Sequence, residues 1–145
     1  MNIFAVFTQR VKKCLEALDL KGPDGNAPDL SRVVVEAPRD PAHGDFATNA
    51  AMVLAKPLGM KPRDLAERLV AELSKDPEIT ETTVAGPGFI NLRVDPSVWR
   101  KILGSILAEG LGYGGRKTAD PSKVNVEYVS ANPTGPMHEI GRAHV

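Results

Sequence analysis

The sequence predicts an α+β fold in which a small antiparallel sheet packs with about four helices. Two observations carry this prediction. Several segments repeat apolar residues at three- and four-residue spacing, as amphipathic helices do, and shorter runs rich in β-branched residues have the character of strands. The 145 residues divide into a domain over residues 1–112, a linker over 113–123 that is rich in glycine and charge, and the beginning of a second domain over 124–145.

The first half of the chain is expected to hold two helices and a strand. Apolar residues at every third or fourth position predict a helix over residues 3–19. The β-branched run Val33–Glu36 predicts a short strand. Asp45 is expected to cap a second helix over residues 46–56, because an aspartate side chain accepts hydrogen bonds from the free N–H groups of a helix's first turn. Pro57 then ends this helix.

The second half predicts a helix, a β-hairpin and a last helix. Pro62 suits the first position of a helix whose buried face carries a leucine at every fourth residue. The runs 79–85 and 89–94 are joined by Gly86-Pro87-Gly88, which predicts a hairpin. Asp95 and the proline after it predict the start of a helix with an apolar stripe made of Val98, Trp99, Ile102, Leu103, Ile106 and Leu107.

The composition argues against several classes of function. Eighteen basic residues balance eighteen acidic ones, so we expect neither a general polyanion-binding protein nor a DNA partner. The single cysteine, Cys14, belongs to the apolar face of the first helix and cannot form a disulfide within the chain. Three histidines without partners at metal-ligand spacing predict no metal site. Because no apolar run approaches the length of a membrane span, we expect a cytoplasmic protein without a membrane partner.

The second strand of the hairpin carries a candidate RNA-binding face. Strand alternation directs Phe89, Asn91 and Arg93 to the face opposite the core. An aromatic ring, an amide and a guanidinium are the groups that stack on an unpaired base, read its edge and contact its phosphate. The alternative is that Phe89 belongs to the core beneath the last helix, with the two polar side chains merely solvated.

Residues 124–145 combine a strand with a loop suited to a nucleotide. Alternation predicts a strand over residues 124–129, and the loop Ser130–Pro136 is rich in small residues, proline and glycine. In parallel α/β sheets, ligands bind beyond the carboxyl ends of the strands, where small residues let the backbone approach a nucleotide. His138 follows this loop, where its ring would donate a hydrogen bond to a phosphate oxygen.

Three motifs resemble those of the arginyl-tRNA synthetases, which are class I aminoacyl-tRNA synthetases. The run Glu127-Tyr128-Val129-Ser130-Ala131-Asn132-Pro133-Thr134-Gly135-Pro136-Met137-His138 resembles the opening of their catalytic domain. His43-Gly44-Asp45-Phe46-Ala47-Thr48-Asn49 and Gly86-Pro87-Gly88-Phe89-Ile90-Asn91 resemble two marks of their additional N-terminal domain. The resemblance implies an arginyl-tRNA synthetase N-terminal domain-like fold, followed by the first strand of a truncated Rossmann-type catalytic domain.

The resemblance also implies an activity and its partners. The parent protein would be an arginine–tRNA ligase, which activates arginine with ATP and Mg and then charges arginine tRNA. This chain would contribute a contact with the tRNA D-loop through Phe89 and Asn91, to which the strand pattern adds Arg93.

The catalytic residues implied by the resemblance lie near the end of the chain. Glu127, Ser130 and Asn132 would bind arginine, with the carboxylate of Glu127 accepting two parallel hydrogen bonds from the substrate guanidinium. His138 would be the catalytic residue. The ATP-binding loop would comprise Pro133, Thr134, Gly135, Pro136, Met137, His138 and Gly141.

The nucleotide-binding box of the family has the pattern His-(Ile/Val/Leu)-Gly-His, and the corresponding run here departs from it as His138-Glu139-Ile140-Gly141-Arg142-Ala143-His144. Glu139 is inserted after the first histidine, and Arg142 stands where the second histidine is expected. Because the catalytic sheet would also be incomplete, we expect this chain alone to be inactive and to hold no cofactor. Two alternatives stay open: a free-standing tRNA-binding module without catalysis, and a protein-interaction domain that uses the face of residues 89–93 or the strand over residues 124–129.

Overall fold

The structure is a computed structural model that describes residues 2–38, 40–115 and 125. The chain up to Gly114 forms one compact unit. Its elements, in chain order, are α1 (Ile3–Ala17), β1 (Val35–Glu36), the 3-10 helix η1 (Pro41–His43), β2 (Phe46–Thr48), α2 (Ala50–Leu54), α3 (Pro62–Leu73), β3 (Ile79–Ala85), β4 (Phe89–Val94), α4 (Pro96–Glu109) and the 3-10 helix η2 (Gly110–Gly112).

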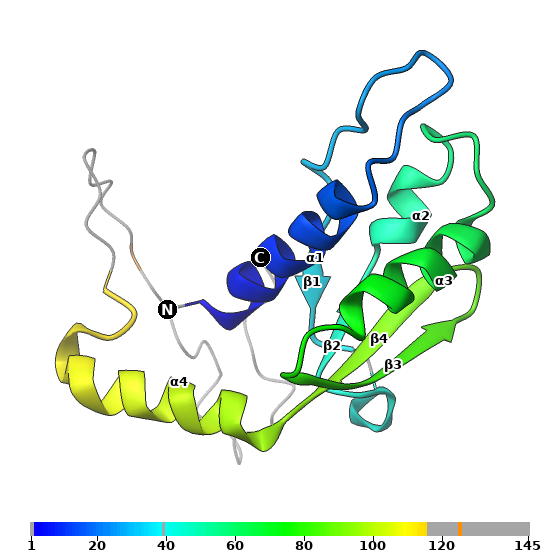
Figure 1. Ribbon diagram of the computed structural model, residues 1–145. Helices are drawn as coiled ribbons and strands as arrows, with labels where there is room; N and C mark the ends of the chain where they lie inside the picture. The colour runs from blue at the N-terminus through cyan, green and yellow to red at the C-terminus, as the bar shows by residue number, and fades with distance from the viewer. Residues whose placement is uncertain (1, 39, 116–124, 126–145) are drawn as a thin grey trace, which may run out of the picture. The chain divides into compact units, whose positions relative to one another are not determined.

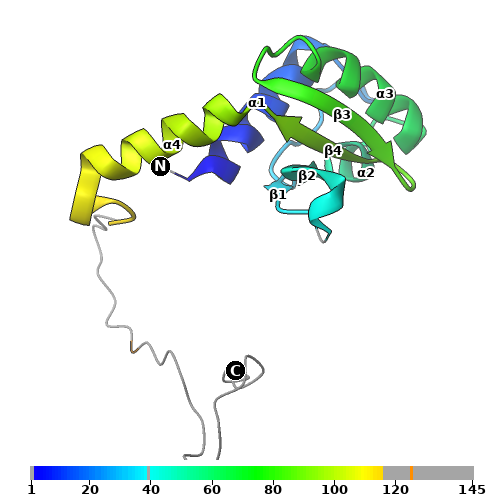
Figure 2. The same cartoon turned by 90° about the horizontal axis from the view of Figure 1, so that it is seen from below.

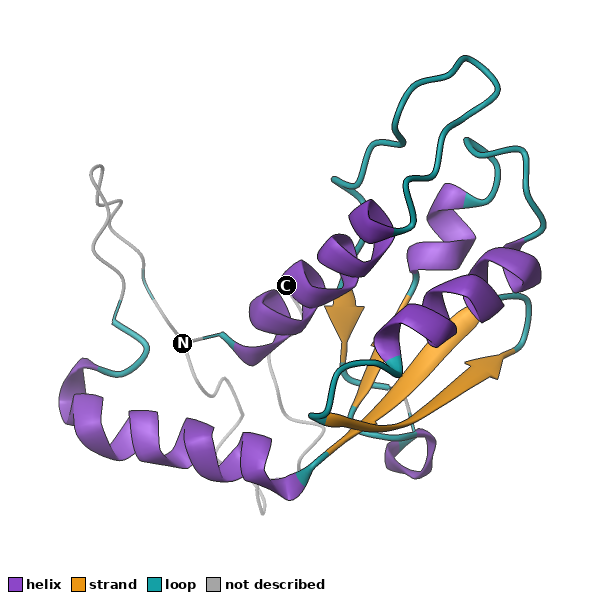
Figure 3. Ribbon diagram, viewed as in Figure 1, coloured by secondary structure: helices purple, strands orange, loops and turns teal. Residues whose placement is uncertain are grey.

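The four strands form one antiparallel sheet in the order β1-β2-β4-β3 (Figure 3). Helices α1, α2 and α3 pack on one face of this sheet (Figure 1). Their buried side chains meet Phe46, Ile90 and Leu92 from the two central strands, each fully buried. The predicted α+β class, with a small antiparallel sheet and about four helices, is therefore confirmed for the described part of the chain.

Two helices follow the sequence pattern closely. In α1, the side chains of Phe7, Val11 and Leu15 are buried, and Asn2 caps the helix by accepting a hydrogen bond from the N–H of Phe4 at 3.0 Å. In α3, the leucines at every fourth position are buried at 0% exposure, and Pro62 begins the helix as expected. The hairpin β3–β4 is also confirmed, with Ala85 opposite Phe89 at its closed end.

The helix expected over residues 46–56 is wrong in its first part. Phe46–Thr48 is strand β2, and the helix that follows, Ala50–Leu54, has only five residues. Asp45 caps no helix: its carboxylate accepts a hydrogen bond from the N–H of Val94 at 2.9 Å, and its own N–H donates to the carbonyl of Leu92 at 2.8 Å. Both bonds tie the start of β2 to β4, so the aspartate fixes the pairing of the two central strands.

Helix α4 begins as predicted, but half of the residues in its apolar stripe are exposed. The carboxylate of Asp95 accepts a hydrogen bond from the N–H of Ser97 at 2.8 Å, which caps the first turn. Of the stripe, Val98 is buried and Ile102 packs against the core. The helix then runs on past the end of β4 (Figure 2), so its later turns have no core to cover. Exposure rises along one face, from 42% to 55% and 74% at Trp99, Leu103 and Leu107, and Leu111 in η2 is also exposed.

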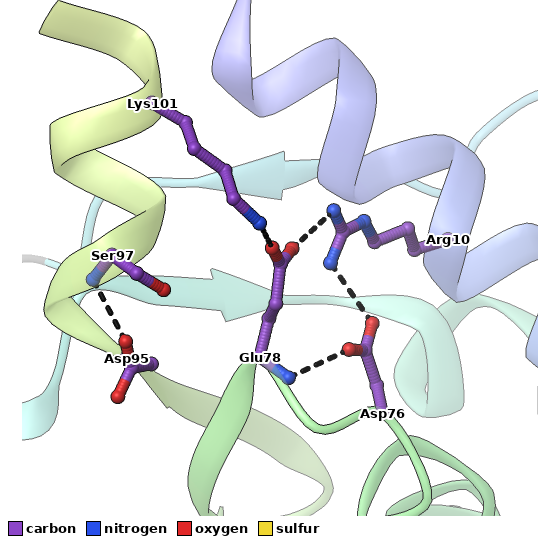
Figure 4. Close-up of polar contacts among 6 residues, drawn as sticks. All are labelled: Arg10, Asp76, Glu78, Asp95, Ser97 and Lys101. Atoms are coloured by element: carbon purple, nitrogen blue, oxygen red, sulfur yellow. Dashed lines mark hydrogen bonds and ion pairs between the residues drawn. The ribbon is translucent and has the colours of Figure 1, made fainter.

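A polar cluster joins α1, α4 and the segment before β3 (Figure 4). The guanidinium of Arg10 donates to the carboxylate of Asp76 at 2.9 Å and to that of Glu78 at 2.6 Å. Glu78 also accepts a hydrogen bond from the ammonium of Lys101 on α4. These bonds, that from Lys101 first and that from Arg10 second, hold the pKa of the Glu78 carboxyl below its usual value. The carboxylate of Glu78 therefore links two helices that no strand pairing connects.

Neutralising Glu78 should make stability depend less on pH. Because its pKa is lowered in the folded state, the stabilisation is complete above the usual pKa of glutamate and is lost as the pH falls through the lowered value. We expect Glu78→Gln to lower the free energy of unfolding by about 1–2 kcal/mol at pH 7, and by much less near pH 3. Urea denaturation at both pH values measures this. Glu67→Gln is the control, since the ion pair of Glu67 with Arg63 is 3.5 Å long and exposed. An equal loss at both pH values would contradict the account.

Candidate nucleic-acid interface

One face of the sheet is left uncovered by the helices and carries polar side chains. Strand alternation puts Glu36, Ala47, Asn91 and Thr83 on this face, because the neighbours of each along its strand point the other way. The four residues stand in one row across the sheet, with Glu36 opposite Ala47, Ala47 opposite Asn91, and Asn91 opposite Thr83. The row brings together three segments that are far apart in the sequence.

A groove of about 600 Å³ opens over this row. This volume is in the range of small-ligand pockets and exceeds what one nucleobase needs. Its wall on the hairpin side includes Phe89 and Asn91, and its opposite wall comes from β1, the residues beside it and Asn49. We call this feature the sheet groove; its lining residues are Val34, Glu36, Ala37, Pro38, His43, Ala47, Thr48, Asn49, Ala85, Gly86, Phe89 and Asn91.

Phe89 stands at the mouth of the sheet groove with 43% of its surface exposed. Its position depends on the hairpin turn. Gly88 has a φ of +146°, and a Cβ added there would lie 2.9 Å from the Cβ of Pro62, so the turn lies directly against the start of α3. The ring is therefore held at the hairpin end of β4 and is not part of the core, which excludes the alternative that Phe89 is a core residue beneath the last helix.

Asn91 lies deeper, with 7% of its surface exposed. Its side-chain amide makes no hydrogen bond within the described part of the chain. The nitrogen and oxygen of this amide are not fully buried, so they can be reached from the groove. The amide also lines a second, smaller cleft of about 160 Å³ beside His43 and Thr83. Since buried polar groups are normally hydrogen-bonded, a free amide that reaches a groove is a group available to a ligand.

Arg93 shares the face but is already engaged. Its guanidinium donates to the carbonyl of Ala42 at 2.7 Å and lies 3.2 Å from the carboxylate of Glu81. The predicted row of ring, amide and cation therefore exists, but the charge of Arg93 is paired within the domain. A phosphate would have to compete with Glu81 for it.

The motif His43–Asn49 holds the walls of the sheet groove in place. Gly44 has a φ of +122°, and a Cβ there would lie 2.6 Å from the carbonyl oxygen of Leu92. Thr48 donates to the carbonyl of Val34 at 2.8 Å, and the Asn49 side chain accepts from the N–H of Val34 at 3.0 Å. These contacts are internal, so they explain the motif structurally and attach β1 to the rest of the sheet.

Two residues of the sheet groove, Glu36 and Ala47, were not anticipated from the sequence. Alternation along Val35–Glu36 would have placed Glu36 on the outer face. Ala47 was not identified because the sequence predicts a helix, and not a strand, over residues 46–56. The methyl side chain of Ala47 leaves room between Glu36 and Asn91, so it forms the floor of the groove.

The candidate catalytic residues lie outside the described part of the chain. Within that part, no group of three histidine, cysteine or acidic side chains is arranged to hold a metal ion. None of the described helices is long and apolar enough to cross a membrane. The residues outside are Glu127, Ser130, Asn132, Pro133, Thr134, Gly135, Pro136, Met137, His138 and Gly141.

Comparison with known families assigns the domain. The model of the arginyl tRNA synthetase N terminal domain matches residues 5–94, which include the whole sheet and the sheet groove. The chain belongs to this family. The match ends at the last residue of β4, so this arginyl-tRNA synthetase N-terminal domain is defined by α1 to α3 and the four strands.

The relatives of this arginyl-tRNA synthetase N-terminal domain are ligases. An arginine–tRNA ligase of Chelativorans sp. (strain BNC1) is 57% identical over 138 residues, and those of Brucella anthropi and Parvibaculum lavamentivorans are 56% identical over the same length. Each match covers 95% of this chain but 24% of the relative, so the chain spans about a quarter of the length of these curated relatives. A solved arginyl-tRNA synthetase of Plasmodium falciparum matches with a TM-score of 0.49 and 16% identity, over 67% of this chain and 17% of the other.

Proposed function

We propose that this domain contacts tRNA by holding one unpaired nucleotide in the sheet groove. The observation that carries the proposal is the pairing of an exposed ring, Phe89, with the free amide of Asn91 in one groove. Aromatic rings stack on bases of any sequence, and an amide offers a donor and an acceptor to a base edge. An unpaired base can enter such a groove, whereas a base in a duplex cannot.

The family of the domain supports arginine tRNA as the nucleic acid. The D-loop is the segment of this tRNA that we propose as the contact. Because the summed charge of the chain is zero, general attraction to a polyanion contributes little, and binding depends on the local groups. Arg93 contributes less to tRNA binding than its charge suggests, because its guanidinium lies 3.2 Å from the carboxylate of Glu81.

We further propose that the whole protein is an arginine–tRNA ligase that uses arginine, ATP and Mg in the cytoplasm. The names of the relatives support this activity. In this proposal Glu127, Ser130 and Asn132 bind arginine, and His138 acts on the ATP phosphates together with the loop before it. The 145-residue chain alone is expected to make no arginyl-adenylate, because it spans about a quarter of the length of the ligases it resembles.

The stacking role of Phe89 predicts a loss of tRNA affinity on truncation. Phe89→Ala should weaken binding of the chain to arginine tRNA by about 1–3 kcal/mol, the usual contribution of one base stacked on an aromatic ring. Fluorescence anisotropy with labelled tRNA at low salt measures this. Phe89→Tyr is the matched control, since it keeps the ring and should keep the affinity.

The result is interpretable because Phe89 is not part of the core. With 43% of the residue exposed, its truncation should change the free energy of unfolding little, and circular dichroism checks that the variant stays folded. A folded Phe89→Ala variant that binds arginine tRNA as well as the parent would contradict the proposed function.

A further inference from the structure

Glu36 places a carboxylate on the wall of the sheet groove opposite Asn91. It is exposed, and it forms no ion pair or side-chain hydrogen bond with the described part of the chain. Two strand spacings separate Glu36 from Asn91, with Ala47 between them, so their Cα atoms lie roughly 10 Å apart. A single planar ring fits over Ala47 between the two side chains.

The chemistry of a carboxylate restricts what can lie in that space. It accepts hydrogen bonds and donates none, and it repels a phosphate group. The part of a nucleotide that faces Glu36 must therefore carry N–H or O–H donors. Adenine, cytosine and guanine each present an exocyclic amino group. Uracil presents one N–H between two carbonyl oxygens, and a carboxylate repels these oxygens.

We infer that Glu36 is a second base-reading residue, which selects a base with an exocyclic amino group for the sheet groove. This inference rests on the proposed function and extends it from stacking to specificity. The base stacks beside Phe89, Asn91 binds one part of its edge, and Glu36 accepts a hydrogen bond from the amino group. The phosphates of the nucleotide extend out of the groove through its open mouth.

The direction in which one substitution changes the affinity for tRNA tests the inference. Removing a negative charge from a protein normally strengthens its binding to a polyanion. The inference requires the opposite for Glu36→Gln: binding of the 145-residue chain to arginine tRNA should weaken about tenfold, because a hydrogen bond to a charged acceptor is replaced by one to a neutral amide. Glu16→Gln is the matched control. Glu16 is an exposed glutamate on α1 without an ion pair in the described structure, so its loss should leave binding unchanged or slightly stronger.

A second measurement separates the base from the ribose as the source of the donor. Chemical-shift titration of the ¹⁵N-labelled chain with AMP, 2′-deoxy-AMP and inosine monophosphate compares the two. Inosine monophosphate carries a carbonyl in place of the adenine amino group. Equal shifts with AMP and 2′-deoxy-AMP, and weaker shifts of the Asn91 signals with inosine monophosphate, are expected. Dependence on the 2′-hydroxyl, equal response to all three, or no response would overturn the assignment to a base amino group.

The two proposals fail in distinguishable ways. If Glu36→Gln strengthens tRNA binding or leaves it unchanged while Phe89→Ala weakens it, the role of Glu36 is wrong and the proposed function stands. If neither substitution weakens binding, or if the chain does not bind tRNA, both are wrong. Weaker binding by both Glu36→Gln and Phe89→Ala, with binding by Glu16→Gln unchanged or slightly stronger, supports both.

Discussion

Replacing Phe46 by alanine is expected to lower the free energy of unfolding by about 3–5 kcal/mol, a large fraction of the stability of a domain of this size. Phe46 is fully buried, and its ring lies 4.4 Å from that of Phe7 and 5.7 Å from that of Trp99, nearly parallel to both. Phe4 meets it edge-on at 5.6 Å. This one ring therefore joins β2 to α1 and α4, and alanine would leave a cavity between all three.

Urea denaturation followed by the fluorescence of Trp99 measures the effect directly. Trp99 is the single tryptophan of the chain, so its emission reports on the contact that the substitution removes. Phe46→Leu keeps most of the volume and should cost about 1–2 kcal/mol. Leu103→Ala, at a side chain with 55% exposure, should change stability little. A loss below about 1 kcal/mol for Phe46→Ala would show that the ring does not link these elements.

Gly44→Ala is expected to destabilise the domain by about 3 kcal/mol or more, although it adds only one methyl group. Gly44 has φ +122° and ψ −163°, a region that residues with a side chain rarely occupy. A Cβ would also lie 2.6 Å from the carbonyl oxygen of Leu92, which accepts the hydrogen bond of the Asp45 N–H. The backbone of β2 would have to move away from β4, and the adjoining wall of the sheet groove would move with it.

Gly25→Ala is the control that separates the two causes. Gly25 also has a positive φ, +77°, but a Cβ there would have no atom within 4 Å. Its substitution should cost only the backbone strain, about 1–2 kcal/mol. Thermal unfolding of both variants measures the difference. Equal costs would mean that the close approach of Gly44 to Leu92 adds nothing.

The elements predicted correctly are those with a strong local pattern. The buried leucines of α3 recur over three turns, and the runs on either side of Gly86-Pro87-Gly88 are long enough to show alternation. Asp95 caps its helix as predicted, because the partner that its carboxylate accepts from, the N–H of Ser97, is two residues away. Each of these features depends on neighbours in the chain, so the sequence contains all the information that the prediction requires.

The error at β2 has a physical reason. Phe46–Thr48 is too short to show alternation, and the alanines around it favour a helix. An aspartate before such a segment has the features of a cap, but the partner of Asp45 is Val94, which is 49 residues away. The strand therefore exists because of β4, and no local pattern records that pairing.

The candidate site could be predicted only in part, because some of its contacts also join residues that are distant in the sequence. Alternation along one strand identified Phe89 and Asn91 as outward-facing residues. It could not show that Glu81 and the Ala42 carbonyl engage Arg93, because these contacts come from another strand and from η1. Nor could it bring Glu36 within reach of Asn91, since that depends on the strand order.

The stripe of α4 shows a further limit of periodicity. The spacing of its apolar residues predicts a helix with one apolar face, which the structure contains. The spacing does not show which residues that face contacts, and from Trp99 to Leu107 the face is increasingly exposed in the described part of the chain.

The central claim is that the sheet groove reads a nucleotide of arginine tRNA, and binding by the Asn91→Ala variant tests it most directly. The parent chain and the variant would be titrated with arginine tRNA and with a tRNA of another specificity, at low and moderate salt. The account predicts that the parent prefers arginine tRNA and that a folded Asn91→Ala variant loses the preference. Equal binding of both tRNAs by the parent, or an undiminished preference in the variant, would contradict it.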